Sequence, residues 1–209
     1  VSGNRLLMNK TWYQIDNMLN QIRSNNFRNK FTDSYGGGWT YSWFCLDHVG
    51  FNGLNPRRRD AGHHSIFDHY FPLQDSGDIV QWHYHPLPVN GNYHGNGIAY
   101  LNSSNIWEIL ARKVIDRQWF PSVYRPGFHV ERPDSHWFLE QWIPFDYANQ
   151  SVTNENEMTD DIQIDISNNR YGNWSRAITE WRSYHPSHED YQVEGHCKRS
   201  IFRCLNMNA

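Results

Sequence analysis

The chain has 209 residues, of which 16% are aromatic and 20% charged, and its formal net charge is −3. Its length indicates a single domain over residues 1–209, and its many aromatic side chains, which bury large apolar areas, exclude a disordered chain. The near-neutral charge lacks the basic surface of a nucleic-acid-binding protein, and no apolar run approaches the ~20 residues of a membrane-spanning helix. Three cysteines cannot all pair with one another, so we expect no disulfide framework and a reducing compartment such as a bacterial cytoplasm.

The first half of the chain predicts one helix and two strands. Apolar residues recur at spacings of three and four over residues 8–22, which predicts an amphipathic helix. An aromatic-rich segment over residues 39–51 predicts a buried strand, and residues 78–83 predict a second, short strand. A loop rich in Pro, Gly and Asn follows up to residue 97.

The second half continues the alternation of helices and strands. We expect helices over residues 106–119, 135–142 and 195–205, and strands over residues 122–125 and 143–147. Residues 162–166 alternate between apolar and polar types ahead of two asparagines, which predicts an appended β-hairpin near the C-terminus. Together these elements favour an α/β fold with parallel strands and right-handed crossovers.

Two histidines follow the strand predicted over residues 78–83. His83 and His85 are two residues apart, so they share one face of an extended chain. Neutral imidazoles bind zinc, and parallel α/β folds build their sites at the carboxyl ends of strands. The pattern predicts half of a zinc site, with two histidines packed in an aromatic core as the alternative. Asp47 and His48 are equally compatible with a ligand or a hydrogen-bonding role, and we favour a loop role for His94.

A second group of titratable residues follows the strand predicted over residues 122–125. Arg125 precedes a Pro-Gly turn, and a guanidinium can bind a carboxylate through two parallel hydrogen bonds. Each residue of the group alone is typical of a salt-bridged surface loop, but their density at one strand end favours a site. The other members of the group are His129, Glu131, Asp134 and His136.

Tryptophan and tyrosine are abundant near both groups, and flat aromatic rings can stack on the C–H face of a sugar. The sequence therefore favours a carbohydrate as the bound molecule. A position in the core is the more common role for any one tryptophan. The tryptophans concerned are Trp82, Trp119, Trp137 and Trp142.

The order of these features resembles the polysaccharide deacetylase superfamily, also called carbohydrate esterase family four, over roughly residues 8–151. Residues 77–86 read G-D-I-V-Q-W-H-Y-H-P and resemble the second motif of that family in a His-x-His-Pro form. Residues 124–129 read Y-R-P-G-F-H and resemble its arginine motif, and residues 143–146 resemble the strand that follows it. The resemblance implies a distorted (β/α) barrel of about seven strands.

The resemblance also implies an activity, namely metal-dependent removal of N- or O-acetyl groups from a saccharide. His83 and His85 would bind a divalent metal, most simply zinc, which polarises a carbonyl and lowers the pKa of its bound water. Arg125 would orient the catalytic base, and His129 would contact the substrate at the reacting centre. The further substrate contacts implied are Trp82, Tyr124 and His136.

The chain departs from the family at several points. The two histidines of the usual second motif are more widely spaced than His83 and His85. The aspartate pair of the first motif, which includes the catalytic base, should precede the first helix, and a histidine motif should lie on a late strand. We expect that the chain is a piece lacking its first and last strands, or that it is a non-catalytic carbohydrate-binding relative. A cupin is a weaker alternative, because the His-x-His pattern after Gly77 lacks the following Glu and because helices are predicted.

Overall fold

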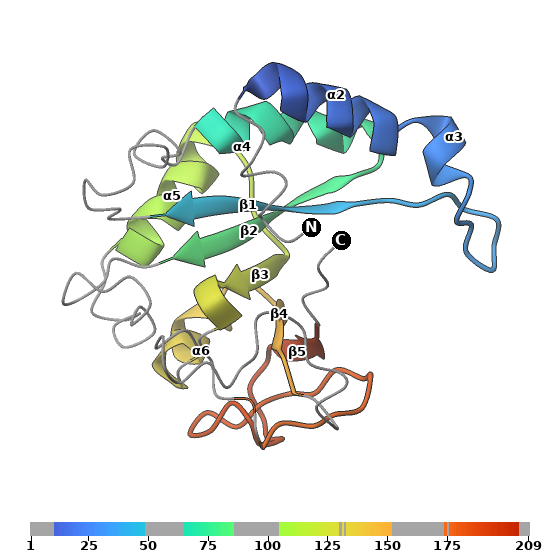
Figure 1. Cartoon of the computed structure of the whole chain (residues 1–209). Helices are drawn as coiled ribbons and strands as arrows, with labels where there is room; N and C mark the ends of the chain where they lie inside the picture. The colour runs from blue at the N-terminus through green and yellow to red at the C-terminus, as the bar shows by residue number, and fades with distance from the viewer. Residues whose placement is uncertain are drawn as a thin grey trace.

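The computed structural model describes residues 11–48, 65–85, 105–129, 131, 133–151, 174 and 176–204. Five strands form one parallel sheet in the order β1-β2-β3-β4-β5 (Figure 1). The strands are β1 (Ser42–His48), β2 (Ile79–His85), β3 (Val123–Pro126), β4 (Phe145–Asn149) and β5 (Ser200–Arg203). The helices are α2 (Trp12–Ile22), α3 (Asn25–Arg28), α4 (Ser65–Tyr70), α5 (Asn105–Arg117) and α6 (Pro133–Leu139), with short 3-10 helices η2 (Phe71–Ser76) and η4 (Gly127–His129).

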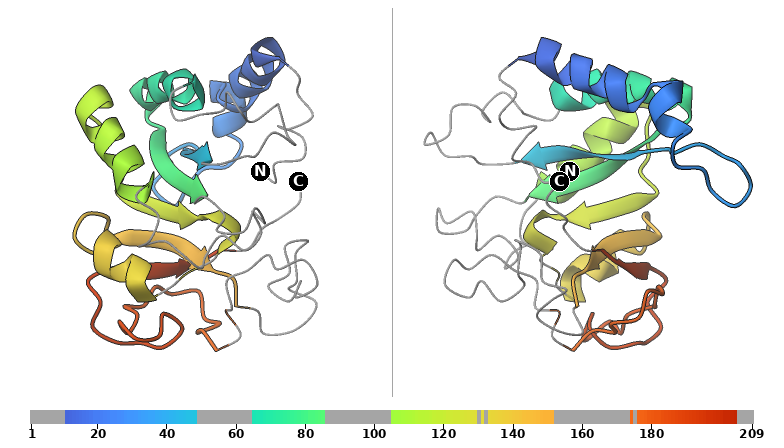
Figure 2. Two further views of the ribbon diagram at one scale, coloured as in Figure 1. Left: turned by 90° about the vertical axis from the view of Figure 1, so that its left-hand side faces the viewer. Right: turned by 45° about the vertical axis from the view of Figure 1, so that its right-hand side comes forward.

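Each strand pairs with its neighbour in the chain, so the sheet is wound in one direction only. Right-handed crossovers in such a sheet bring all the connecting helices to the same face. Figure 2 shows this arrangement, with α2, α4 and α5 on one side of the strands. The predicted α/β fold with parallel strands is confirmed. The five described strands form an open sheet that is not closed into a barrel, and the parallel strands differ from the antiparallel jelly roll of a cupin.

The sequence patterns correspond to most of these elements. The segment predicted as a strand over 39–51 contains β1, those over 78–83, 122–125 and 143–147 overlap β2, β3 and β4, and the predicted helices over 8–22, 106–119 and 135–142 overlap α2, α5 and α6. The helix predicted over 195–205 is wrong, because residues 200–203 form β5. The two-residue alternation of this strand is concealed in the sequence, since a charged residue, Arg203, takes one of the buried positions. The hairpin predicted over 162–166 lies outside the described residues.

The core lies between the helices and one face of the sheet. Strand pairing aligns one residue from each strand in a single row across this face. The row consists of Cys45, Trp82, Tyr124, Asp146 and Ile201, and the last four are completely buried. Burial of each large apolar side chain of this kind stabilises the fold by about 1.5–3 kcal/mol, so the aromatic content of the chain supplies much of its core.

The buried carboxylate of Asp78 fixes α2 and α3 to the sheet. Arg28 donates to both of its oxygens at 2.8 and 2.9 Å, and Arg23 Nε donates at 3.0 Å. The Trp43 indole N–H (3.0 Å) and the Tyr41 backbone N–H (3.1 Å) complete the set. Burial acts to raise the pKa of Asp78, but the hydrogen bonds and the charge of Arg28 outweigh it, so the pKa lies below its usual value. Asp78 is therefore ionised in the folded protein at neutral pH.

The helices are short and amphipathic. The longest described helix, α5, has 13 residues and carries exposed Arg112 and Asp116 beside buried Ile106 and Ile109. Among the described residues, no helix has the length and apolar character needed to cross a membrane.

Candidate functional site

His83 and Arg125 lie next to each other on the sheet face opposite the core. They are paired in the register of β2 and β3, near the carboxyl ends of both strands. The ring nitrogen Nδ1 of His83 is 2.8 Å from the carbonyl oxygen of Arg125. Because a carbonyl only accepts, Nδ1 carries the proton and the lone pair of the ring is on Nε2. This is the arrangement in which proteins commonly orient a metal-binding histidine.

His129 extends this contact through the Arg125 side chain. A guanidinium nitrogen of Arg125 is 2.6 Å from Nε2 of His129, so the histidine accepts from the arginine. Its Nδ1 donates to the carbonyl oxygen of Ala148 at 3.3 Å, and the Trp174 indole donates to the His129 carbonyl at 2.9 Å. His129 has a positive φ of 53° and is only 2% exposed. It is therefore a buried group that holds Arg125 in place, with little surface for a substrate.

The register also aligns further histidine positions at this edge of the sheet. His48, the last residue of β1, is paired with His85, the last residue of β2. Residues two apart in a strand share a face, so position 85 lies on the face of His83. His94 lies outside the described residues, as do the side chains of Asp47, His48, His85 and Asp134.

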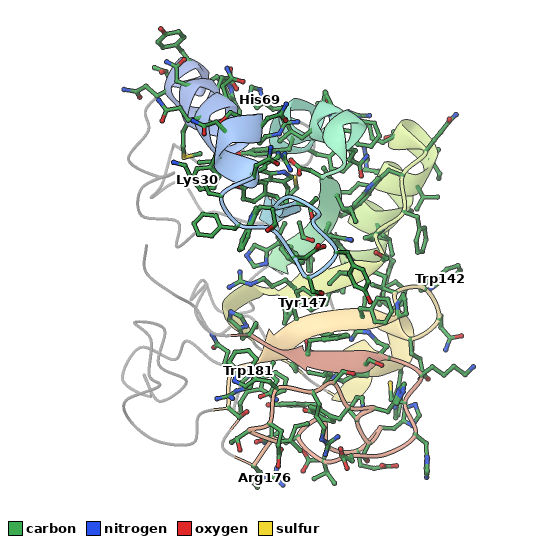
Figure 3. The ribbon with its side chains drawn as sticks, turned by 90° about the vertical axis from the view of Figure 1, so that its right-hand side faces the viewer. Lys30, His69, Trp142, Tyr147, Arg176 and Trp181 are labelled. Atoms are coloured by element: carbon green, nitrogen blue, oxygen red, sulfur yellow. The ribbon has the colours of Figure 1, made fainter. Side chains whose placement is uncertain are left out.

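Three aromatic rings share the face of His83 and Arg125. The rings of Phe44 and Tyr147 are 5.7 Å apart, and those of Tyr147 and Phe202 are 5.2 Å apart (Tyr147 is labelled in Figure 3). Phe44 is on β1 and Tyr147 on β4, which are separated by two strands, or about 14 Å in a flat sheet. Their contact indicates that the sheet is concave on this face.

The expected substrate contacts Trp82, Tyr124 and His136 lie on the other face. All three are completely buried, and the rings of Trp82 and Tyr124 contact each other at 5.2 Å. A sugar cannot stack on a ring without exposed surface, so this placement disagrees with the predicted role. The alternation of a strand explains it, since Trp82 and Tyr124 each directly precede a residue of the opposite face. Of the other tryptophans considered, Trp119 is buried, whereas Trp137 and Trp142 are exposed.

Behind the sheet, His136 belongs to a buried ionic cluster that the sequence predicted only in part. Arg199 pairs with Asp146 at 2.8 Å and donates to Nδ1 of His136 at 3.1 Å, and Nε2 of His136 is 3.3 Å from Glu131. The side chains of all four residues, Arg199, Asp146, His136 and Glu131, are completely buried. Donor atoms of Glu131, His136 and Asp146 lie within 4.8 Å of one another, as in a metal site. The guanidinium of Arg199 already pairs with the Asp146 carboxyl group, which also shares a hydrogen bond with Glu131, so we interpret the group as an internal ion-pair cluster.

Burial determines the protonation of this cluster. It lowers the pKa of His136 well below its usual value, with the nearby charges of Arg199 and His188 acting in the same direction. It also raises the pKa of Asp146, in spite of the opposing effect of Arg199. His136 is therefore neutral, which agrees with its acceptance of a hydrogen bond from Arg199.

The pKa of His136 predicts a pH-dependent contribution to stability. Below about pH 6.5 the unfolded chain takes up a proton at His136, whereas the folded protein does not. The free energy of unfolding of the wild type therefore falls by up to about 1.4 kcal/mol for each pH unit of acidification. We expect His136→Asn to be less stable than the wild type at pH 7 and the difference to narrow on acidification. Urea unfolding between about pH 5 and pH 7 measures it, with His69→Asn as the control. A difference that is constant with pH would contradict the prediction.

Comparisons with models of known protein families, with curated proteins and with solved structures found no match for this chain. The function is therefore proposed from the contacts of its own residues. Of the site predicted from the sequence, His83, Arg125 and His129 are brought into direct contact. Trp82, Tyr124 and His136 are separated from them by the sheet.

Proposed function

We propose that the chain belongs to a metal-dependent deacetylase that removes N- or O-acetyl groups from a saccharide, as its resemblance to the polysaccharide deacetylases implies. The observation that supports this proposal best is the contact of His83 with Arg125 at the carboxyl ends of β2 and β3. This is the edge at which parallel α/β folds build their sites.

The shape of the sheet supports the finer proposal of a distorted (β/α) barrel of about seven strands. Strands in sequential order, with helices on one face, are typical of such barrels. The contact of Phe44 with Tyr147 across the opposite face fits a sheet that curls toward that side. The five described strands would then be a part of the barrel wall.

In this proposal His83 and His85 hold the metal, most simply zinc, and His48 is the third candidate ligand. The fit rests on the tautomer of His83, which carries its lone pair on Nε2, and on the pairing of His48 with His85. A divalent metal bound there would polarise the carbonyl group of the substrate and lower the pKa of its own bound water.

Arg125 and His129 have positioning roles in this proposal. The Arg125 carbonyl fixes the ring of His83, and its guanidinium is fixed by His129. The positive charge is thereby held at the strand end, where it can orient a carboxylate base or the acyl group of a substrate. The resemblance implies an aspartate base ahead of the first helix, and residues 1–11 of this chain contain no carboxylate side chain. The aromatic surface for a sugar would come from Tyr147 and its neighbours.

The proposal predicts that His83→Ala removes one divalent metal per chain and abolishes acetate release from N-acetylated chito-oligosaccharides. His69→Ala is the matched control, because His69 contacts Trp12 and Asp16 in the helical layer, far from the strand ends (Figure 3). Metal content by mass spectrometry and acetate by a coupled assay are the measurements. Unchanged metal content in a His83→Ala, His85→Ala double variant would contradict the ligand assignment.

A non-catalytic carbohydrate-binding protein is the second candidate. The deep burial of His129, with both ring nitrogens in hydrogen bonds, favours it, because this histidine then cannot exchange a proton with a substrate. Metal bound through His83 and saccharide binding without acetate release would replace the deacetylase proposal with this one.

A further inference from the structure

A second group of metal-binding side chains lies at the opposite edge of the sheet. It consists of Glu140, His188 and Cys197, whose donor atoms all lie within 4.8 Å of one another. Glu140 directly follows α6, which returns the chain toward the amino end of β4, and Cys197 shortly precedes β5. The group therefore lies near the amino ends of the strands, whereas His83 lies at the carboxyl ends.

The three side chains already interact through Glu140. Its carboxylate oxygens are 3.0 and 3.1 Å from Nε2 of His188, and one of them accepts from the Cys197 thiol at 3.3 Å. The same oxygen accepts from the backbone N–H of Lys198 at 3.1 Å. Cys197 is 1% exposed, the Glu140 side chain 12% and the His188 side chain 34%. The group is therefore buried at the thiol and open to solvent at the imidazole.

The backbone around these residues is held by its own contacts. The segment from His185 to Cys197 folds back on itself, with hydrogen bonds from Gly195 to His185 (2.7 Å) and from Cys197 to Pro186 (2.9 Å). A Cβ atom on Gly195 would lie 2.5 Å from Cα of Ser187, so only glycine permits this approach. His188 and Cys197 are thus presented from a preformed hairpin-like turn.

We propose that Glu140, His188 and Cys197 form a zinc site that clamps the segment over 185–197 to the end of α6. A thiolate, an imidazole and a carboxylate are the usual ligands of zinc, whereas magnesium and calcium prefer oxygen ligands alone. Zinc bonds of about 2.1–2.3 Å in a tetrahedron separate neighbouring ligand atoms by about 3.5 Å. The contacts of Glu140 with His188 and Cys197, at 3.0 to 3.3 Å, lie within about 0.5 Å of that value, and the donor atoms of His188 and Cys197 lie within 4.8 Å of each other, so small side-chain movements suffice.

Zinc binding at these three side chains requires no reactant other than the hydrated ion. The thiol of Cys197 loses its proton to the solvent, and the hydrated zinc ion releases all but one of its waters as sulfur, nitrogen and oxygen bind. The remaining water takes the fourth position. The role we assign to this zinc is to hold the segment over 185–197 against the end of α6.

Cobalt titration of the metal-free full-length chain tests the site, because a thiolate bound to Co²⁺ gives a near-ultraviolet charge-transfer band that the histidine site at β2 cannot give. We expect the band in the wild type and its loss on adding zinc, which binds more tightly. Cys197→Ser should abolish the band, and His188→Asn should weaken cobalt binding by more than about 100-fold. Zinc should raise the Tm of the wild type and leave that of Cys197→Ser unchanged.

Three control variants separate this site from others in the chain. Cys45→Ala removes a buried thiol of β1, and His196→Ala removes the exposed histidine next to Cys197, and both should retain the band. His83→Ala should also retain it, which distinguishes this site from the proposed deacetylase centre. Absence of the band in the folded wild type, or its survival in Cys197→Ser, would overturn the proposal. If Cys197→Ser does not fold, the weaker cobalt binding expected of His188→Asn still tests the site.

Discussion

Replacing Arg199 by Met is expected to lower the free energy of unfolding by about 3–5 kcal/mol, because it leaves buried charge without its partner. Arg199 pairs with Asp146 at 2.8 Å, donates to the carbonyl of Ile143 at 3.0 Å and contacts His136. None of these groups has access to water that could replace the guanidinium. Urea unfolding at neutral pH measures the loss.

A surface pair provides the matched control. Arg182 pairs with Glu194, and both side chains are 52% exposed. Arg182→Met should leave the stability nearly unchanged, since solvent screens an exposed pair. In the Arg199→Met, Asp146→Asn double variant, the loss should be smaller than the sum of the two single losses, because the unpaired charge is gone. Additive losses would show that the two side chains do not interact as described.

Replacing Asp78 by Ala is expected to have a comparable effect, about 3–5 kcal/mol, because five donors lose their common acceptor. Three of them belong to the side chains of Arg23 and Arg28, which would be left as charges in a partly buried setting. We expect α2 and α3 to separate from the sheet first, which hydrogen exchange of their backbone amides would detect. Asp68→Ala is the control, since its pair with Arg117 is about half exposed.

The lowered pKa of Asp78 fixes the sign of its pH dependence. A carboxyl group with a folded-state pKa below its unfolded value stabilises the protein above the unfolded value, about 3.9, and loses that contribution as the pH falls further. The difference in stability between the wild type and Asp78→Ala should therefore shrink in acid. A difference that grew in acid would mean that Asp78 is not held as an anion.

Strand-end reasoning predicted part of the candidate site. His83 and Arg125 were expected at the ends of two strands, and the register shows that these strands are neighbours and brings the two residues together. Trp82 and Tyr124 directly precede them in the sequence, but the alternation of a strand places these two side chains in the core. β5 was not predicted because Arg203 conceals its pattern.

The Glu140 cluster was beyond sequence reasoning for a different reason. Glu140 lies 48 residues from His188 and 57 from Cys197, so only tertiary packing unites them. The close spacing of His185, His188, His196 and Cys197 was a signal that could have drawn attention to one half of the cluster. No local pattern identifies Glu140 as the third member. The same holds for Arg199, which meets His136 across 63 residues.

The sequential strand order has a consequence for how the chain folds. Because every described strand pairs with the one before it, each closure spans only the segment between two successive strands, and the entropy lost in closing it grows only slowly with length. A growing chain can therefore complete the β1–β2 unit around Asp78 before β4 and β5 have been synthesised. The Arg199 cluster, which joins α6, β4 and the residue next to β5, forms last. The two buried charge centres thus act in succession, one at the start of folding and one at its end.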